Sequence, residues 1–208
     1  MLIDTHCHLD QLPNPATALA EAATQGVSQV VALSESVASM RAVLALKEAH
    51  PAAVVAGLGL HPAWISQQTP KAVEAGLQFL AAHLPLAQVL GEVGLDHQWA
   101  TTPQERAFQE EILVRQLDLA AAAAKPANFH SRRCPRQVME RAIAFARQTG
   151  LNAQLHWFTH SRKLIRQCNE AGIYVSVGPM VVDDPQTQEV ALAIADDFLL
   201  IETDAPVA

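Results

Sequence analysis

The chain has 208 residues, half of them hydrophobic, and its 14 basic and 21 acidic side chains give a net charge of −7. No apolar run is long enough to cross a bilayer, and an acidic chain is a poor candidate for broad binding to duplex phosphates. Cys7, Cys134 and Cys168 are too few and too scattered for a disulfide framework or a Cys-x-x-Cys zinc site. Because the N-terminus also lacks a signal-peptide pattern, we expect a cytoplasmic globular protein with no membrane segment and no obligate protein partner.

Short apolar runs alternate with longer amphipathic segments along the chain. In order, we predict a strand over residues 2–8, a helix over 15–25, a strand over 28–33, a helix over 36–50 and a strand over 53–58. A helix over 70–83, a strand over 88–93, a helix over 103–124 and a strand over 126–130 follow. The last elements are a helix over 135–149, a strand over 152–156, a helix over 162–171, a strand over 173–177, a helix over 185–195 and a strand over 198–202.

Eight strands separated by seven helices predict an α/β fold of the (β/α)8 TIM-barrel type. The strands read as continuous apolar runs, as expected for parallel strands that helices cover on the outside. An open doubly wound sheet is the alternative, but it would carry a glycine-rich phosphate loop after the first strand, and the sequence has none there. We expect one domain over residues 1–208, truncated at its C-terminus, because six residues after the last strand leave no sequence for an eighth helix.

Residues able to bind a metal ion fall at the ends of the predicted strands, where barrel enzymes have their active sites. Two histidines two residues apart on a strand point to the same face, yet a lone His-x-His is a weak signal. The signal is strengthened by similar residues at the other strand ends. The candidate site residues are His6, His8, His61, Glu92, His130, His156 and Asp204. Imidazoles and carboxylates suit Zn, Mn, Fe or Ni and leave Mg possible. Four of these histidines and the two carboxylates already exceed the needs of one tetrahedral ion, so we infer two ions bridged by a carboxylate.

Basic side chains close to two of these strand ends could bind phosphate. Arg132 and Arg133 directly follow His130, and Arg162 and Lys163 lie shortly after His156. The alternative is that they are solvated charges at helix starts. Among acidic side chains, we interpret Asp96 as a turn former that could position substrate. Asp4 shares the strand face of His6, and we interpret it as a structural or supporting residue.

Several blocks resemble the motifs of the TatD-type metal-dependent hydrolases, a deoxyribonuclease family of the amidohydrolase superfamily. They are Asp4-Thr5-His6-Cys7-His8-Leu9-Asp10, Gly59-Leu60-His61-Pro62, Gly91-Glu92-Val93-Gly94-Leu95-Asp96, His130-Ser131-Arg132, His156-Trp157-Phe158-Thr159 and Glu202-Thr203-Asp204-Ala205-Pro206. The resemblance implies that one ion is held by His6, His8, Glu92 and Asp204, and a second by Glu92, His130 and His156. It leaves His61 and Arg132 near the substrate. Asn128, Trp157 and His160 depart from the family pattern.

The predicted activity is hydrolysis of a phosphodiester of DNA, or of another phosphate ester, with two divalent ions such as Zn, Mg or Mn. A hydroxide held between the ions would attack phosphorus, with Asp204 as general base and later proton donor. Alternatively, Asp204 is a ligand only or a helix cap. The same site could also hydrolyse a lactone, a cyclic amide or a phosphotriester. A last alternative is a truncated, non-catalytic metal-binding domain.

Overall fold

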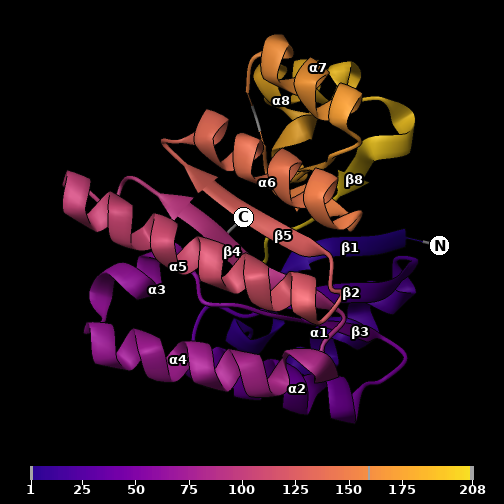
Figure 1. Ribbon diagram of the computed structural model, residues 1–208. Coiled ribbons are helices and arrows are strands. Elements are labelled where there is room, and N and C mark those ends of the chain that lie inside the picture. Colours follow the sequence, from indigo (N-terminus) through magenta and orange to yellow (C-terminus); the bar gives the residue numbers. More distant parts are fainter. Residues whose placement is uncertain (1, 159, 207–208) are drawn as a thin grey trace.

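Eight parallel strands follow one another around one sheet in the order of the sequence, as the predicted barrel requires (Figure 1). The computed structural model describes residues 2–158 and 160–206. Its strands are β1 (Leu2–Cys7), β2 (Val27–Leu33), β3 (Val54–Leu58), β4 (Val89–Asp96), β5 (Ala127–Arg132), β6 (Ala153–Leu155), β7 (Tyr174–Val177) and β8 (Leu199–Ile201). The predicted (β/α)8 class is therefore confirmed.

Helices connect the strands and cover the outside of the barrel (Figure 1). They are α1 (Pro15–Thr24), α2 (Val37–Ala49), α3 (Pro62–Gln67), α4 (Pro70–His83), α5 (Pro103–Ala122), α6 (Pro135–Thr149), α7 (Arg162–Ala171) and α8 (Pro185–Ala193). The prediction of a single helix between β3 and β4 is wrong, because this connection contains both α3 and α4. In the described residues, no helix is long and apolar enough to span a bilayer.

Local sequence signals account for the helix starts. Thr102 caps α5 through its hydroxyl, which accepts from the backbone N–H of Glu105, and the Glu105 carboxylate accepts from the N–H of Thr102 in return. Thr69 caps α4 through its hydroxyl, which accepts from the N–H of Ala72, and Pro70 occupies its first turn, where a missing N–H costs no helical hydrogen bond. At the other end, Gly150 takes the left-handed conformation that terminates α6.

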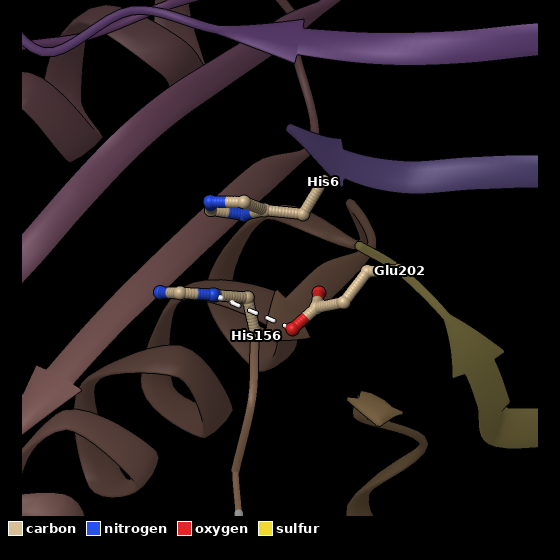
Figure 2. A group of neighbouring side chains, drawn as sticks. All are labelled: His6, His156 and Glu202. Atoms are coloured by element: carbon tan, nitrogen blue, oxygen red, sulfur yellow. Dashed lines mark ion pairs between the residues drawn. The ribbon is translucent and has the colours of Figure 1, made fainter. Parts of the chain in front are cut away.

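The seam between β8 and β1 closes at the end of the barrel that carries the first two histidines. The backbone N–H of Asp204 donates to the carbonyl of His6 at 2.9 Å, and the N–H of His8 donates to the carbonyl of Ala205 at 2.8 Å. Figure 2 shows the outcome, with His6 from β1 opposite His156 and Glu202 from the ends of β6 and β8. Residues far apart in sequence are thus brought together by closure of the sheet.

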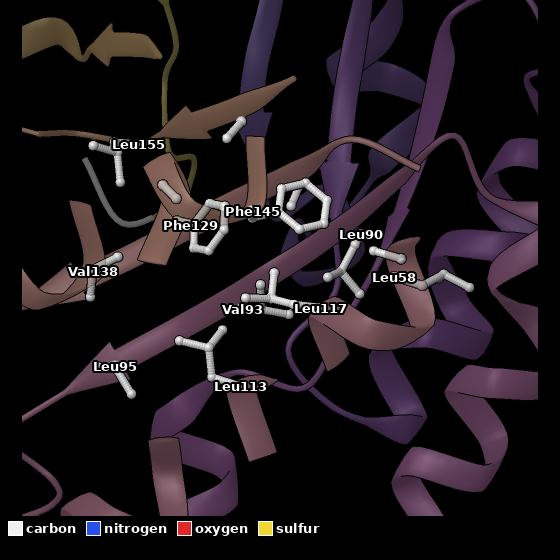
Figure 3. Close-up of a cluster of buried hydrophobic side chains, with 14 of the residues drawn as sticks. Leu58, Leu90, Val93, Leu95, Leu113, Leu117, Phe129, Val138, Phe145 and Leu155 are labelled. Carbon is white, nitrogen blue, oxygen red and sulfur yellow. The ribbon is translucent and has the colours of Figure 1, made fainter. Parts of the chain in front are cut away.

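The hydrophobic core lies between the sheet and the helices (Figure 3). On one side of it, fully buried side chains of β4 and β5, such as Val93 and Phe129, meet Leu113 of α5 and Phe145 of α6. The rings of Phe129 and Phe145 pack edge to face with centroids 6.3 Å apart. This packing fixes α5 and α6 against the strands that carry Glu92 and His130.

Strand β4 extends three residues beyond its predicted end at 93, because Gly94 permits an unusually close approach to β5. Gly94 has φ 155°, and a Cβ there would collide with the carbonyl oxygen of His130. Asp96 therefore ends the strand and is buried, whereas the sequence placed it in a loop. Its turn-forming role is nevertheless present, since Oδ1 accepts from the backbone N–H of Gln98 at 2.8 Å.

Candidate metal centre

A cavity of about 560 Å³ opens at the C-terminal ends of the strands. Of the eight predicted site residues, seven line this cavity, namely His8, His61, Glu92, His130, Arg132, His156 and Asp204. The eighth, His6, is fully buried and contacts Glu92 and Asp204. The structure thus brings the whole predicted set to one place.

Glu92 lies at the centre of the cluster, and its two carboxylate oxygens face different histidines. Oε2 lies 3.6 Å from Nε2 of His6 and 3.3 Å from Nε2 of His8. Oε1 lies 2.8 Å from Nδ1 of His130 and 2.8 Å from Nε2 of His156. Each oxygen of this carboxylate therefore contacts a different pair of imidazoles.

Hydrogen bonds at Nδ1 set the tautomers of the first pair. Nδ1 of His8 lies 3.1 Å from the carbonyl of Leu33, which can only accept, so the proton is on Nδ1. Nδ1 of His6 lies 3.0 Å from Oδ1 of Asn128. Because this amide oxygen can only accept, Nδ1 of His6 donates and also carries the proton. In the neutral rings the lone pair is therefore on Nε2. Both Nε2 atoms lie 3.4 Å from Oδ1 of Asp204.

His61 has the opposite tautomer. Its Nδ1 accepts the backbone N–H of Ala63 at 3.0 Å, where the side chain caps α3. The proton of the neutral ring is consequently on Nε2, which lies 3.6 Å from Oε1 of Glu92. Although His61, Glu92 and His130 have ligand atoms within 4.8 Å of one another, His61 offers a hydrogen-bond donor to the cavity and no lone pair.

His130 lies between two carboxylates. Its Nε2 is 3.4 Å from Oδ2 of Asp96, on the side of the ring away from Glu92. The backbone of Asp96 is held by Gln109 of α5, whose Oε1 accepts its N–H at 2.9 Å. A buried glutamine on a helix thus positions the carboxylate that contacts His130. This contact could not be predicted from the sequence, where Asp96 resembles a turn residue in a loop.

His156 stacks on His6, with ring centroids 3.8 Å apart and 13° between the planes (Figure 2). Its Nδ1 lies 3.6 Å from Oε1 of Glu202, which also accepts the backbone N–H of Trp157 at 2.8 Å. Oε2 of Glu202 accepts the hydroxyl of Ser176 at 2.5 Å. Glu202 is therefore a fixed carboxylate behind the imidazole, a partner that metal-ligating histidines almost always have.

The cluster shifts the acid-base equilibria of its own members. Burial raises the pKa of Glu92 and Asp204, but neighbouring imidazoles outweigh it, and both carboxyls end below their usual range. Burial lowers the pKa of His6, His8, His130 and His156, but contacts with the carboxylates outweigh it in turn, whereas the pKa of His61 ends below its usual value. The pKa of His8 rises to about 11, and those of His130 and His156 rise to about 9.

The donor set fits divalent cations. Among the described residues, Nε2 of His6 and Oδ1 of Asp204 are buried without a hydrogen-bond partner. Buried polar atoms without partners are costly unless something else satisfies them. Two further groups of ligand atoms within 4.8 Å are His6, His8 and Glu92, and His6, His156 and Glu202. Imidazole and carboxylate ligands are those that Zn, Mn and Fe accept.

This chain resembles a known protein family over nearly its whole length. Residues 3–208 match the family model described as TatD related DNase. The chain belongs to this TatD family. Among its relatives, the metal-dependent hydrolase YjjV of Escherichia coli is 31% identical over 98% of this chain and 79% of its own length. Human deoxyribonuclease TATDN3 is 26% identical over 99% of this chain and 78% of its own.

The fold comparison agrees. The crystal structure of the TatD homologue YjjV from Escherichia coli superposes with a TM-score of 0.83 and 27% identity, covering 99% of this chain and 79% of that one. The predicted family is therefore confirmed, and this TatD protein is a metal-dependent hydrolase that acts on ester bonds.

Of the basic side chains near the site of this TatD protein, only Arg132 lines its central cavity, at the exposed end of β5. Arg133 lies in a separate surface pocket at the start of α6. Nε of Arg162 lies 3.8 Å from a carboxylate oxygen of Glu189, and Lys163 is exposed at the start of α7. For these three, the alternative of solvated charges near helix starts agrees better with their positions.

The departures from the TatD pattern have local explanations. Asn128 is polar in a buried strand because it bonds to His6, and Trp157 follows His156 in a left-handed conformation with φ 41°. His160 packs edge to face on Phe158, with centroids 4.8 Å apart. Asp4 accepts hydrogen bonds from the backbone N–H and hydroxyl of Thr203 at 3.0 and 2.6 Å, which is a structural role at the seam.

Proposed function

We propose that this TatD-family hydrolase cleaves phosphodiester bonds of DNA with two divalent cations. His6, His8, Glu92 and Asp204 bind one cation, and Glu92, His130 and His156 bind the other. The observation that carries the proposal is the position of Glu92, whose two oxygens face the two histidine pairs separately at 2.8–3.6 Å. A carboxylate that served one ion would not need a pair of imidazoles on each side.

The ligand chemistry supports Zn, Mn or Mg as the bound ions, with the histidines favouring Zn and Mn. When bound, two divalent ions at such a site supply a hydroxide nucleophile at neutral pH and positive charge for the phosphate oxygens. The remaining tasks fall to the side chains. Asp204, whose carboxyl is ionised at neutral pH, accepts a proton from the attacking water and returns it to the leaving oxygen.

Two further side chains position the substrate. His61 presents Nε2–H to the cavity, because its Nδ1 is occupied by the backbone N–H of Ala63. It therefore donates a hydrogen bond to a phosphate oxygen and binds no cation. Arg132 extends from the exposed end of β5 at the cavity edge and binds the next phosphate through its planar guanidinium. DNA as the substrate is supported by the deoxyribonuclease name of the human relative.

The test is a screen of cations against substrates. The purified protein is stripped with chelator, reloaded with Mg, Mn or Zn, and given single-stranded DNA, double-stranded DNA and RNA. The same preparations are given a lactone, a cyclic amide and a phosphotriester. We expect nucleotide release from DNA that chelator abolishes. Glu92→Gln serves as the inactive control. Glu74→Gln serves as the active one, because Glu74 is a partly exposed residue of α4 paired with Arg115.

Two results would contradict the proposal. Turnover of the lactone, amide or triester with no release from DNA would assign the site to another ester or amide. Bound metal without turnover of any substrate would favour a metal-binding domain that does not catalyse.

A further inference from the structure

Two tryptophans line the cavity beside the proposed cation ligands. Trp99 lies in the turn after β4, where its backbone N–H donates to the carbonyl of Asp96 at 3.2 Å. Trp157 directly follows His156 at the end of β6. Neither ring is needed to hold a metal or move a proton. Their position at the cavity therefore points to contacts with the substrate.

Trp157 is held rigidly. Its backbone has φ 41°, a conformation that non-glycine residues adopt rarely, and its N–H donates to Oε1 of Glu202 at 2.8 Å. The indole packs over the backbone of Gly178, where a Cβ would lie 3.7 Å from three atoms of the fused ring. The same carboxylate that contacts His156 thus orients the neighbouring tryptophan.

Trp99 differs in being accessible. Its side chain is 46% exposed, although a large apolar ring normally gains free energy by burial. An exposed tryptophan at the edge of a catalytic cavity loses this gain unless a ligand covers it. Because stacking on an aromatic ring requires an accessible face, Trp99 is the better placed of the two to receive a flat ligand.

The cavity has room for such a ligand next to the scissile group. Its volume of about 560 Å³ falls within the roughly 300–1,000 Å³ of sites that bind whole small molecules. Arg132 lies on the same cavity and supplies positive charge for a backbone phosphate. Flat aromatic surfaces combined with a cationic groove are the elements by which proteins bind single-stranded nucleic acid.

We propose that Trp99 and Trp157 bind unpaired nucleobases on either side of the cleaved phosphodiester, so that the protein selects single-stranded substrate through its bases. This inference rests on the proposed phosphodiesterase function. In a duplex the faces of the bases are covered by their neighbours, and an indole cannot reach them. A strand end or an unpaired segment exposes them.

The experiment measures binding separately from cleavage. Fluorescence anisotropy is recorded with a labelled decathymidylate and with a labelled decamer of abasic sites, which keeps the phosphates and lacks the bases. Both carry phosphorothioate linkages to slow cleavage, and a duplex of the same length is the third probe. The protein is used as purified, and each variant is first checked for an unchanged melting temperature.

We expect the unmodified protein to bind decathymidylate about 5- to 100-fold more tightly than the abasic decamer, as stacking of one or two bases predicts. Trp99→Ala should lose most of this preference, while Trp99→Phe should retain part of it because a ring remains. Leu192→Ala is the matched control, since Leu192 is an apolar side chain of α8 that is 87% exposed and absent from the cavity lining. Trp157→Phe tests the second ring with less risk to the fold than alanine.

Equal affinity for the thymidylate and abasic decamers, or an undiminished preference in Trp99→Ala, would overturn the inference. Failure of both oligomers to bind would overturn it as well. Hydrolysis of bis(p-nitrophenyl) phosphate separates the two proposals. If it occurs without base-dependent binding, only the inference fails. If base-dependent binding occurs without hydrolysis of any phosphodiester, only the proposed function fails.

Discussion

Asn128 and His6 lie 122 residues apart in the sequence and are joined by a 3.0 Å contact between amide Oδ1 and ring Nδ1. Both side chains are buried, so the contact is shielded from water. It holds the proton on Nδ1 and directs Nε2 toward Glu92 and Asp204. The metal centre therefore depends on a residue that touches none of the proposed cations.

Replacement of Asn128 should weaken cation binding while leaving the fold intact. Leucine has nearly the same shape, and the Nδ2 of Asn128 has no partner among the described residues, so Asn128→Leu removes only the contact to His6. We expect affinity for the first cation to fall roughly 10- to 100-fold, the range for residues that orient a ligand. Calorimetric titration with Zn or Mn measures it. Asn128→Asp keeps the acceptor and should bind as tightly as the unmodified protein. A leucine variant with unchanged affinity would contradict this role.

Glu92→Gln should abolish binding of the second cation and weaken the first. An amide keeps the shape of the carboxylate but removes the negative charge shared by both histidine pairs. Metal analysis after gel filtration should find fewer than two ions per chain, against two in Glu74→Gln. Two ions retained in Glu92→Gln would rule out the bridging role.

His61 and His130 should respond differently to alanine substitution. Because Nε2 of His61 carries the proton, His61→Ala should leave metal content unchanged and raise KM for the substrate. His130→Ala should lose one ion, since its Nδ1 lies 2.8 Å from Glu92. The metal content of both variants and their KM for one substrate are measured side by side. Loss of metal in His61→Ala would show that the ring changes tautomer to bind an ion.

Asp204→Asn should lower kcat on the order of 10²- to 10⁴-fold at saturating cation, because the amide cannot accept a proton. The pair His130 and His156 should still bind its ion. Single-turnover kinetics measure the chemical step directly. Activity equal to that of the unmodified protein would remove Asp204 from the proton transfer.

Cation binding should release protons and strengthen with rising pH. The pKa values of His130 and His156 are raised to about 9, from an ordinary value near 6.5, so both rings are protonated at pH 7 in the metal-free protein. A raised pKa in the folded state stabilises the metal-free fold fully below about pH 6.5, and this stabilisation is lost as the pH rises through about 9. A cation must displace these protons, so its apparent affinity increases over the same interval. Calorimetry at pH 7 in buffers of different ionisation enthalpy counts the protons. If no protons are released and the affinity for the cation does not change between pH 6 and 9, the raised pKa values of His130 and His156 are contradicted.

The fold was largely predictable because each strand of a covered barrel is apolar on both faces. All eight strands lie where continuous apolar runs indicated them, with ends that differ by up to three residues. Helix α3 was missed because its six residues carry little periodicity, and its start depends on a cap from His61. The end of β4 was missed because Gly94 resembles a turn residue, whereas its role is to admit the backbone of β5.

The contacts that polar residues make around the site were harder to predict, although one sequence pattern indicates which residues make them. A polar residue stands two positions before several site residues, a spacing that in an extended strand puts both on the same face. Asn128 precedes His130 in this way, Gln154 precedes His156, and Glu202 precedes Asp204. Each nevertheless contacts a residue of another strand, such as His6 for Asn128 and Ser176 for Gln154. Strand parity can place such residues inside the barrel, but partner choice depends on the stagger between strands.

The hydrogen bonds of the seam between β8 and β1 should become more stable when a cation binds. Asp204 contributes its backbone N–H to the carbonyl of His6 and its carboxylate to the proposed cation. An ion held by that carboxylate therefore also resists opening of the seam. The amide protons of Asp204 and His8 should exchange with deuterated solvent more slowly once the cation is bound. The exchange rates of these two protons would therefore measure how much of the metal centre is occupied.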